Sequence, residues 1–106
     1  MRRGEIWSVA GRGYAAKPRP VLVVQSDGTL PSYDSVVVCL LTSVDRDDAC
    51  RVRIENLPET GLKRESWVMA DKILAVRKDE LGSRIGRLPD AEMTRVSQAL
   101  RTVLGL

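Results

Sequence analysis

The sequence predicts a β-dominated α+β fold, in which short strands close into a barrel-like sheet and one C-terminal helix covers an opening. Apolar residues of the 106-residue chain gather in short, often β-branched runs of strand length. Clusters of Gly, Pro, Ser and Asp separate these runs. Only the C-terminal segment changes to a helical period. The length fits one domain spanning residues 1–106.

The expected strands follow one another through most of the chain. They are Glu5–Val9, Pro20–Gln25, Ser35–Thr42, Arg51–Ile54, Ser66–Leu74 and Arg84–Leu88. Ser35–Thr42 is apolar on both faces, which is typical of a central strand. Arg51–Ile54 alternates strictly, which predicts a half-exposed strand with two arginines on one face.

The C-terminal segment predicts the helix. Apolar residues recur there at helical spacing: Met93, Val96, Leu100, Val103 and Leu104. Pro89-Asp90 suits the helix start and Gly105 its end. Lys78–Leu81 is compatible with one further helical turn.

Charge and cysteine content limit the functional classes. The net charge is +3 and the isoelectric point is near 9.2, which modestly favours a polyanionic partner, although a solvated basic surface is the simpler interpretation. Two cysteines without paired spacing argue against zinc binding and against a disulfide framework, and Cys39 is expected to be a buried apolar residue. Neither a signal peptide nor a membrane-spanning stretch is recognisable, so we expect a cytoplasmic protein that has no membrane contact.

Arg19 is the most informative single residue. It stands between Pro18 and Pro20 directly before the apolar run Val21–Val24, so both its backbone and its approach are restricted. A stiffened arginine at the start of a strand is well placed to bind a phosphate or carboxylate, and a surface ion pair is the alternative. Because the chain contains no histidine, proton transfer would fall to other residue types.

The order of these segments resembles the MazF/PemK family of toxin endoribonucleases from toxin–antitoxin pairs. The resemblance is carried by Arg3–Trp7, Arg19–Gln25, Leu41–Ser43, Gly61-Leu62, Ser66–Ile73, Ile85–Leu88 and Leu100–Leu106. It implies an SH3-like small barrel with a C-terminal α-helix, usually dimeric. It also implies cleavage of single-stranded RNA, chiefly mRNA, without a metal or another cofactor.

In that resemblance Arg19 and Thr42 match the catalytic arginine and threonine of the family. The 2′-hydroxyl attacks the neighbouring phosphate, which leaves a 2′,3′-cyclic phosphate and a 5′-hydroxyl. Thr42 has a plainer alternative role, in which its hydroxyl satisfies backbone groups of the following loop. Ser43 either contacts substrate or caps the same loop.

The resemblance also suggests RNA-binding residues, namely Lys17, Ser43, Trp67, Asp71 and Lys72. Asp71 lies in an otherwise apolar strand, where a carboxylate needs a partner or the surface. One branch of the family pairs this acid with an arginine two residues earlier. Met69 stands at that position here, so we expect no arginine–aspartate pair and assign Asp71 to substrate binding before catalysis.

Aromatic residues are the candidates for base stacking. By alternation Trp67 shares a strand face with Asp71, so it either stacks a base or packs in the protein. Tyr14 is a second candidate, in the loop Ala10–Lys17. By the resemblance, this loop is shorter than in many relatives and lacks the glutamate that they often carry before the arginine.

Two other functional classes remain open, one that binds a protein and one that binds RNA without cutting it. A gyrase-poisoning toxin shares the fold but uses an aromatic residue near the end of its last helix, where this chain has Val103–Leu106. A non-catalytic RNA-binding module is the other alternative. For the nuclease, we expect a homodimer silenced by an acidic cognate antitoxin.

Overall fold

The computed structural model describes residues 1–10, 17–46 and 48–106 of the chain. Its strands are β1 (Glu5–Val9), β2 (Arg19–Val23), β3 (Ser35–Thr42), β4 (Arg51–Ile54), β5 (Ser66–Arg77) and β6 (Leu81–Arg87), and α1 (Asp90–Leu104) follows them. Short 3-10 helices connect some of them: η1 (Leu30–Ser32), η2 (Pro58–Thr60) and η3 (Lys78–Glu80). The predicted β-dominated α+β class is confirmed, with helix and central-strand bounds close to those expected.

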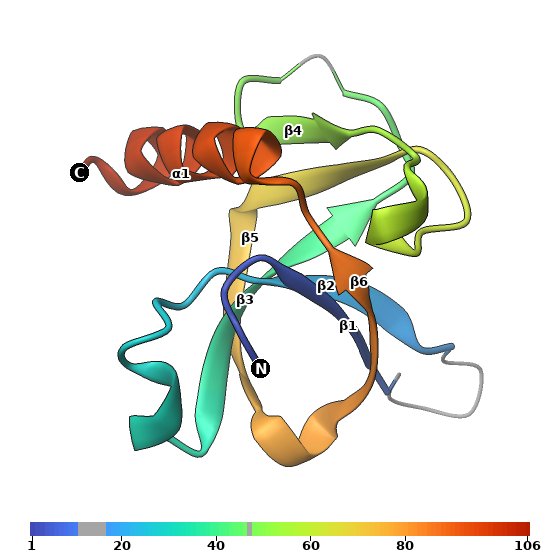
Figure 1. The fold of residues 1–106 in the computed structure, drawn as a ribbon. Coiled ribbons are helices and arrows are strands. Elements are labelled where there is room, and N and C mark those ends of the chain that lie inside the picture. The colour runs from blue at the N-terminus through green and yellow to red at the C-terminus, as the bar shows by residue number, and fades with distance from the viewer. Residues whose placement is uncertain (11–16, 47) are drawn as a thin grey trace.

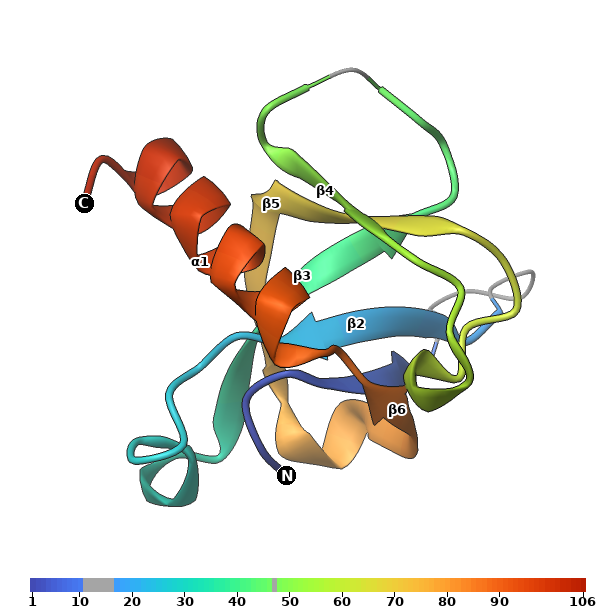
Figure 2. The same ribbon diagram turned by 45° about the horizontal axis from the view of Figure 1, so that its top comes forward.

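The six strands form one strongly curved antiparallel sheet in the order β4-β5-β3-β2-β1-β6 (Figure 1). β3 lies between β5 and β2, as its apolar faces predict. The described strands β4 and β6 are the sheet edges, and η2 packs beside the end of β6 (Figure 2). A Cβ atom at Gly86 would overlap the backbone of Thr60, so glycine permits this close approach. Among the described strands β4 and β6 do not pair with each other, and η2 covers the end of β6 instead.

β5 turns sharply part-way along its length (Figure 1). Cys39 and Leu41, two residues apart on β3, pair with Ile73 and Val68, which are five residues apart on β5. The extra residues form a bulge that bends the strand. Asp71 and Lys72 lie in this bend and are exposed. We call these two residues, together with their neighbour Arg51 on β4, the β5 corner.

The core consists almost entirely of aliphatic side chains in two clusters. The first includes Ile6, Leu22, Ile54, Val68, Leu88 and Val96, and the second includes Val21, Val23, Leu30, Val36, Val38 and Val76. Each fully buried side chain of this size contributes about 1.5–3 kcal/mol. Cys39 is fully buried, as predicted, and burial raises the pKa of its thiol to about 11, which keeps it protonated and unreactive at neutral pH.

Helix α1 packs on β4 and β5 and is tied to the N-terminus. Val96 and Ala99 are buried against the first core cluster. Gly105 ends the helix in the left-handed conformation, at φ 71°, and its N–H donates to the carbonyl of Arg101. Arg3 donates to Ser97 Oγ at 2.6 Å and also to the carbonyl of Val24, so α1 is fixed relative to the strands that carry the site.

Candidate active site

A hollow of about 830 Å³ opens where β2 begins, β3 ends and the segment between η2 and β5 passes. Three of the predicted site residues line it: Arg19, Thr42 and Ser43. Aliphatic side chains, including Leu62, Met69 and Ile85, form much of the rest of its wall. Residues remote in sequence are thus gathered at one place by the sheet order.

Arg19 is the first residue of β2 and pairs with Val9 of β1. Its side chain is exposed at the hollow, with Pro18 and Pro20 on either side. Within the described part of the chain no carboxylate pairs with its guanidinium. Its fork of N–H donors is therefore available to an anion, and the alternative of a surface ion pair is not what these residues show.

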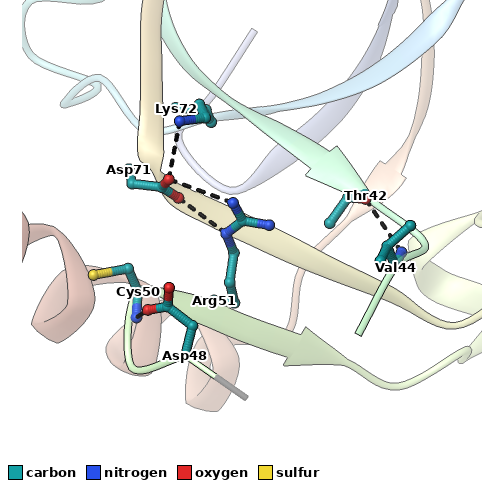
Figure 3. Close-up of polar contacts among 7 residues, drawn as sticks. All are labelled: Thr42, Val44, Asp48, Cys50, Arg51, Asp71 and Lys72. Carbon is teal, nitrogen blue, oxygen red and sulfur yellow. Dashed lines mark hydrogen bonds and ion pairs between the residues drawn. The ribbon is translucent and has the colours of Figure 1, made fainter. Parts of the chain in front are cut away.

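Thr42 is the last residue of β3, beside the loop that carries Ser43. Its Oγ1 accepts a hydrogen bond of 3.2 Å from the backbone N–H of Val44 (Figure 3). This is the loop-capping contact expected as the plainer role. That bond uses an oxygen lone pair, so the hydroxyl proton remains able to donate to a ligand in the hollow. Thr42 can therefore serve both roles.

The β5 corner corrects the expectation that Asp71 has no arginine partner. Arg51 Nε donates to Asp71 Oδ1 at 3.0 Å, and its Nη2 donates to Oδ2 at 3.4 Å (Figure 3). Lys72 Nζ lies 3.1 Å from Asp71 Oδ2. The arginine is supplied by the neighbouring strand, because Arg51 pairs in register with Met69. Alternation in the sequence predicts that the two arginines of β4 share one face. Only the register between β4 and β5 shows that Arg51 reaches Asp71.

These contacts set the charge of Asp71. The hydrogen bonds from Arg51, assisted by Lys72, lower the pKa of its carboxyl below the usual value, against the opposing effect of desolvation. Asp71 is therefore an anion at neutral pH and a poor proton donor. Neither Asp71 nor Lys72 lines the hollow.

Comparison with known proteins identifies the family. Residues 2–104 match the family described as PemK-like, MazF-like toxin of type II toxin-antitoxin system. The chain is 44% identical, over 108 aligned positions, to the probable endoribonuclease MazF of Mycolicibacterium smegmatis, covering 100% of this chain and 98% of that relative. The chain belongs to the PemK/MazF toxin family.

Solved structures agree with this assignment. An endoribonuclease in complex with its cognate antitoxin, from a mycobacterial species, superposes with a TM-score of 0.86 at 29% identity, covering 100% of this chain and 96% of that one. A mycobacterial endoribonuclease superposes with a TM-score of 0.83 at 30% identity, covering 100% and 92% of the two chains. The predicted family, and the small barrel with a C-terminal helix, are confirmed.

The remaining predicted RNA-binding residues lie outside the hollow. Lys17 is exposed two residues before Arg19, so it remains a predicted phosphate contact at the edge of the site. Trp67 is only 8% exposed, and the bend in β5 ends the alternation that was expected to place it beside Asp71. Packing, the alternative considered for Trp67, is what this conformation shows. Tyr14 and most of the loop Ala10–Lys17 lie outside the described residues.

Proposed function

We propose that this toxin is an endoribonuclease that cuts single-stranded RNA, chiefly mRNA, at short sequences and so inhibits translation and growth. The observation that carries the proposal is the hollow that Arg19 and Thr42 both line. The names of the relatives as endoribonucleases support the same activity.

The chemistry proposed is an internal transesterification. The 2′-hydroxyl attacks the adjacent phosphorus and the bond to the 5′-oxygen breaks, which gives a 2′,3′-cyclic phosphate and a 5′-hydroxyl. Arg19 would bind the negative charge that grows on the phosphoryl oxygens, and the Thr42 hydroxyl would donate to one of them. Because arginine rarely releases its proton, we assign Arg19 to charge stabilisation before acid catalysis. Neither role requires a metal.

The test is cleavage of a long defined RNA by the purified protein in excess EDTA, with the product ends mapped by primer extension and by phosphatase and kinase treatment. We expect cyclic phosphate and 5′-hydroxyl ends at a short recurring sequence. Cleavage that requires added magnesium would contradict the mechanism. RNA binding without any cleavage would favour the non-catalytic module instead.

We further propose that the toxin acts in the cytoplasm as a homodimer that an acidic antitoxin silences. Leu104 and Leu106 near the end of α1 are 55% and 85% exposed, which supports burial of this end in an assembly. The related toxin solved with its cognate antitoxin supports the second partner. Light scattering at micromolar concentration should give twice the chain mass, and a stable monomer would refute the dimer. Saturating cognate antitoxin should abolish cleavage.

No helix in the described part of the chain has the length and hydropathy needed to cross a membrane.

A further inference from the structure

The hollow carries positive charge from other residues in addition to Arg19. Of the described residues that line it, three are charged, Arg19, Lys63 and Arg64, and all three are positive. Among the described residues that line it there is no Asp or Glu. The acid next to Arg64 in sequence is Glu65, which instead accepts a 2.7 Å hydrogen bond from Arg53 Nε on β4. Within the described part of the chain, no carboxylate on the wall of the hollow neutralises these three cations.

The segment that carries Lys63 and Arg64 is held at both ends. At one end Gly61 adopts φ 67° against the carbonyl of Ile85, and the buried Thr60 accepts a 3.3 Å hydrogen bond from the Leu62 N–H. At the other end the buried Ser66 donates to the carbonyl of Arg64 at 3.0 Å. A cationic pair on a fixed segment loses less conformational entropy when it binds an anion than a pair on a free loop.

The side chains of Lys63 and Arg64 are available to a ligand. Both are exposed, and within the described chain neither forms an ion pair with a carboxylate. The wall of the same hollow also includes aliphatic residues such as Leu62 and Ile85. Such a surface fits the apolar faces of bases, and the cations fit the phosphates that connect them.

We propose that Lys63 and Arg64 form a second phosphate-binding subsite of the hollow, which holds the RNA backbone next to the phosphate engaged by Arg19. This subsite rests on the proposed nuclease function. Phosphate contacts fix the position of a strand without reading its sequence. Lys63 and Arg64 are therefore positioning residues, which act on RNA of every sequence and not on the choice of cleavage site.

The experiment measures binding apart from chemistry. A fluorescent, 2′-O-methylated oligonucleotide of mixed sequence cannot be cut, because its 2′-oxygens are blocked, and its Kd is measured by anisotropy over a range of salt. For K63Q/R64Q we expect Kd to rise about tenfold or more at low salt. We also expect the slope of log Kd against log salt to fall by about 1.4, since each phosphate contact on a single strand contributes about 0.7.

The matched control is R77Q/R87Q, which removes the same charge from exposed arginines paired with Asp79 and Asp90 outside the hollow. It should leave the slope unchanged. K63R/R64K, which keeps the charges, should restore binding, and thermal unfolding should show that all variants remain folded. Equal slopes for K63Q/R64Q and R77Q/R87Q would overturn the subsite.

Cleavage of unmodified RNA separates this inference from the proposed function. If the wild type cuts RNA but K63Q/R64Q retains its KM and salt slope, the subsite is wrong and the nuclease stands. If the wild type binds with the expected loss in K63Q/R64Q but never cuts, the nuclease is wrong and the subsite stands as a binding site.

Discussion

The hollow and the β5 corner both contain arginines, and the two regions use them in opposite ways. At the corner, Arg51 is matched to Asp71, and Lys72 shares the same carboxylate. The side chain of Arg51 is only 9% exposed. In the hollow, Arg19 is exposed and the described residues offer it no carboxylate.

The difference indicates which charges serve the fold and which serve a ligand. A charge that the protein itself satisfies has little left to offer a substrate, whereas an unsatisfied cation on a fixed element is free to bind an anion. By this criterion we propose the hollow as the site of chemistry. We propose a structural role for the corner pair, because it links β4 to the bend in β5.

Removing the Thr42 hydroxyl should have a large effect on the cleavage rate. Thr42→Val keeps the shape of the side chain, so we expect kcat to fall by roughly two or more orders of magnitude, by analogy with loss of one oxyanion donor. The measurement is single-turnover cleavage of a defined RNA. Thr94→Val is the control, because the Thr94 hydroxyl donates to the Asp90 carbonyl within α1 and to no other described residue. A rate for Thr42→Val near that of Thr94→Val would remove Thr42 from catalysis.

Substitution of Gly61 should disturb the wall of the hollow through the backbone. Its φ of 67° and the overlap of a Cβ atom with the Ile85 carbonyl predict that Gly61→Ala loses about 2 kcal/mol or more of unfolding free energy. Urea denaturation measures the loss. Gly28→Ala is the control, since no described atom lies within 4 Å of its added methyl group. Equal stabilities of the two variants would show that the η2 contact with β6 is dispensable.

Breaking the corner pair should lower stability and not rate. Arg51→Gln leaves Asp71 with Lys72 alone, and we expect a loss of about 1 kcal/mol, because the carboxylate is partly solvated. Arg51 lowers the pKa of Asp71 in the folded protein, so its stabilisation is present above about pH 4 and disappears as Asp71 protonates at lower pH. Unfolding measured at pH 7 and at pH 2–3 tests this. If Arg51→Gln were still less stable than the wild type by the same amount at pH 2–3, the ion-pair explanation would be refuted.

The one stabilising effect among these predictions is expected at Glu92. Glu92 is 7% exposed, and no described residue forms a hydrogen bond with its Oε2. Burial raises the pKa of Glu92, reinforced by Glu55 and Glu59 and opposed by Arg95 and a backbone hydrogen bond from Glu55. Glu92→Gln should therefore raise the unfolding free energy by about 1 kcal/mol at pH 8. Because the wild-type carboxyl takes up a proton as the pH falls, that advantage should shrink in acid.

The strands were predictable from the sequence where the hydrophobic pattern ends at turn-forming residues. β1, β3 and β4 have the predicted bounds, because alternation or a continuous apolar run ends at turn-forming residues. β5 runs to Arg77, beyond the predicted Leu74, and its bend at Asp71 was missed, because a bulge depends on the pairing of two strands.

The candidate site was predictable only in part, because some of its contacts also depend on the pairing of strands. Arg19 was found from its proline frame, and Thr42 from the family resemblance. The Arg51–Asp71 pair depends on a cross-strand register that no local pattern contains. Lys63 and Arg64 resemble any solvated turn in sequence, and only their place on the wall of the hollow distinguishes them.

The most direct test of this account compares two charge-matched variants, Arg19→Gln and Arg51→Gln, each assayed for RNA cleavage and for unfolding free energy. We predict that Arg19→Gln loses roughly two or more orders of magnitude in kcat/KM and remains as stable as the wild type. We predict that Arg51→Gln loses about 1 kcal/mol of stability and keeps its rate within a few-fold. A folded Arg51→Gln protein as inactive as Arg19→Gln would contradict the division between the hollow and the corner.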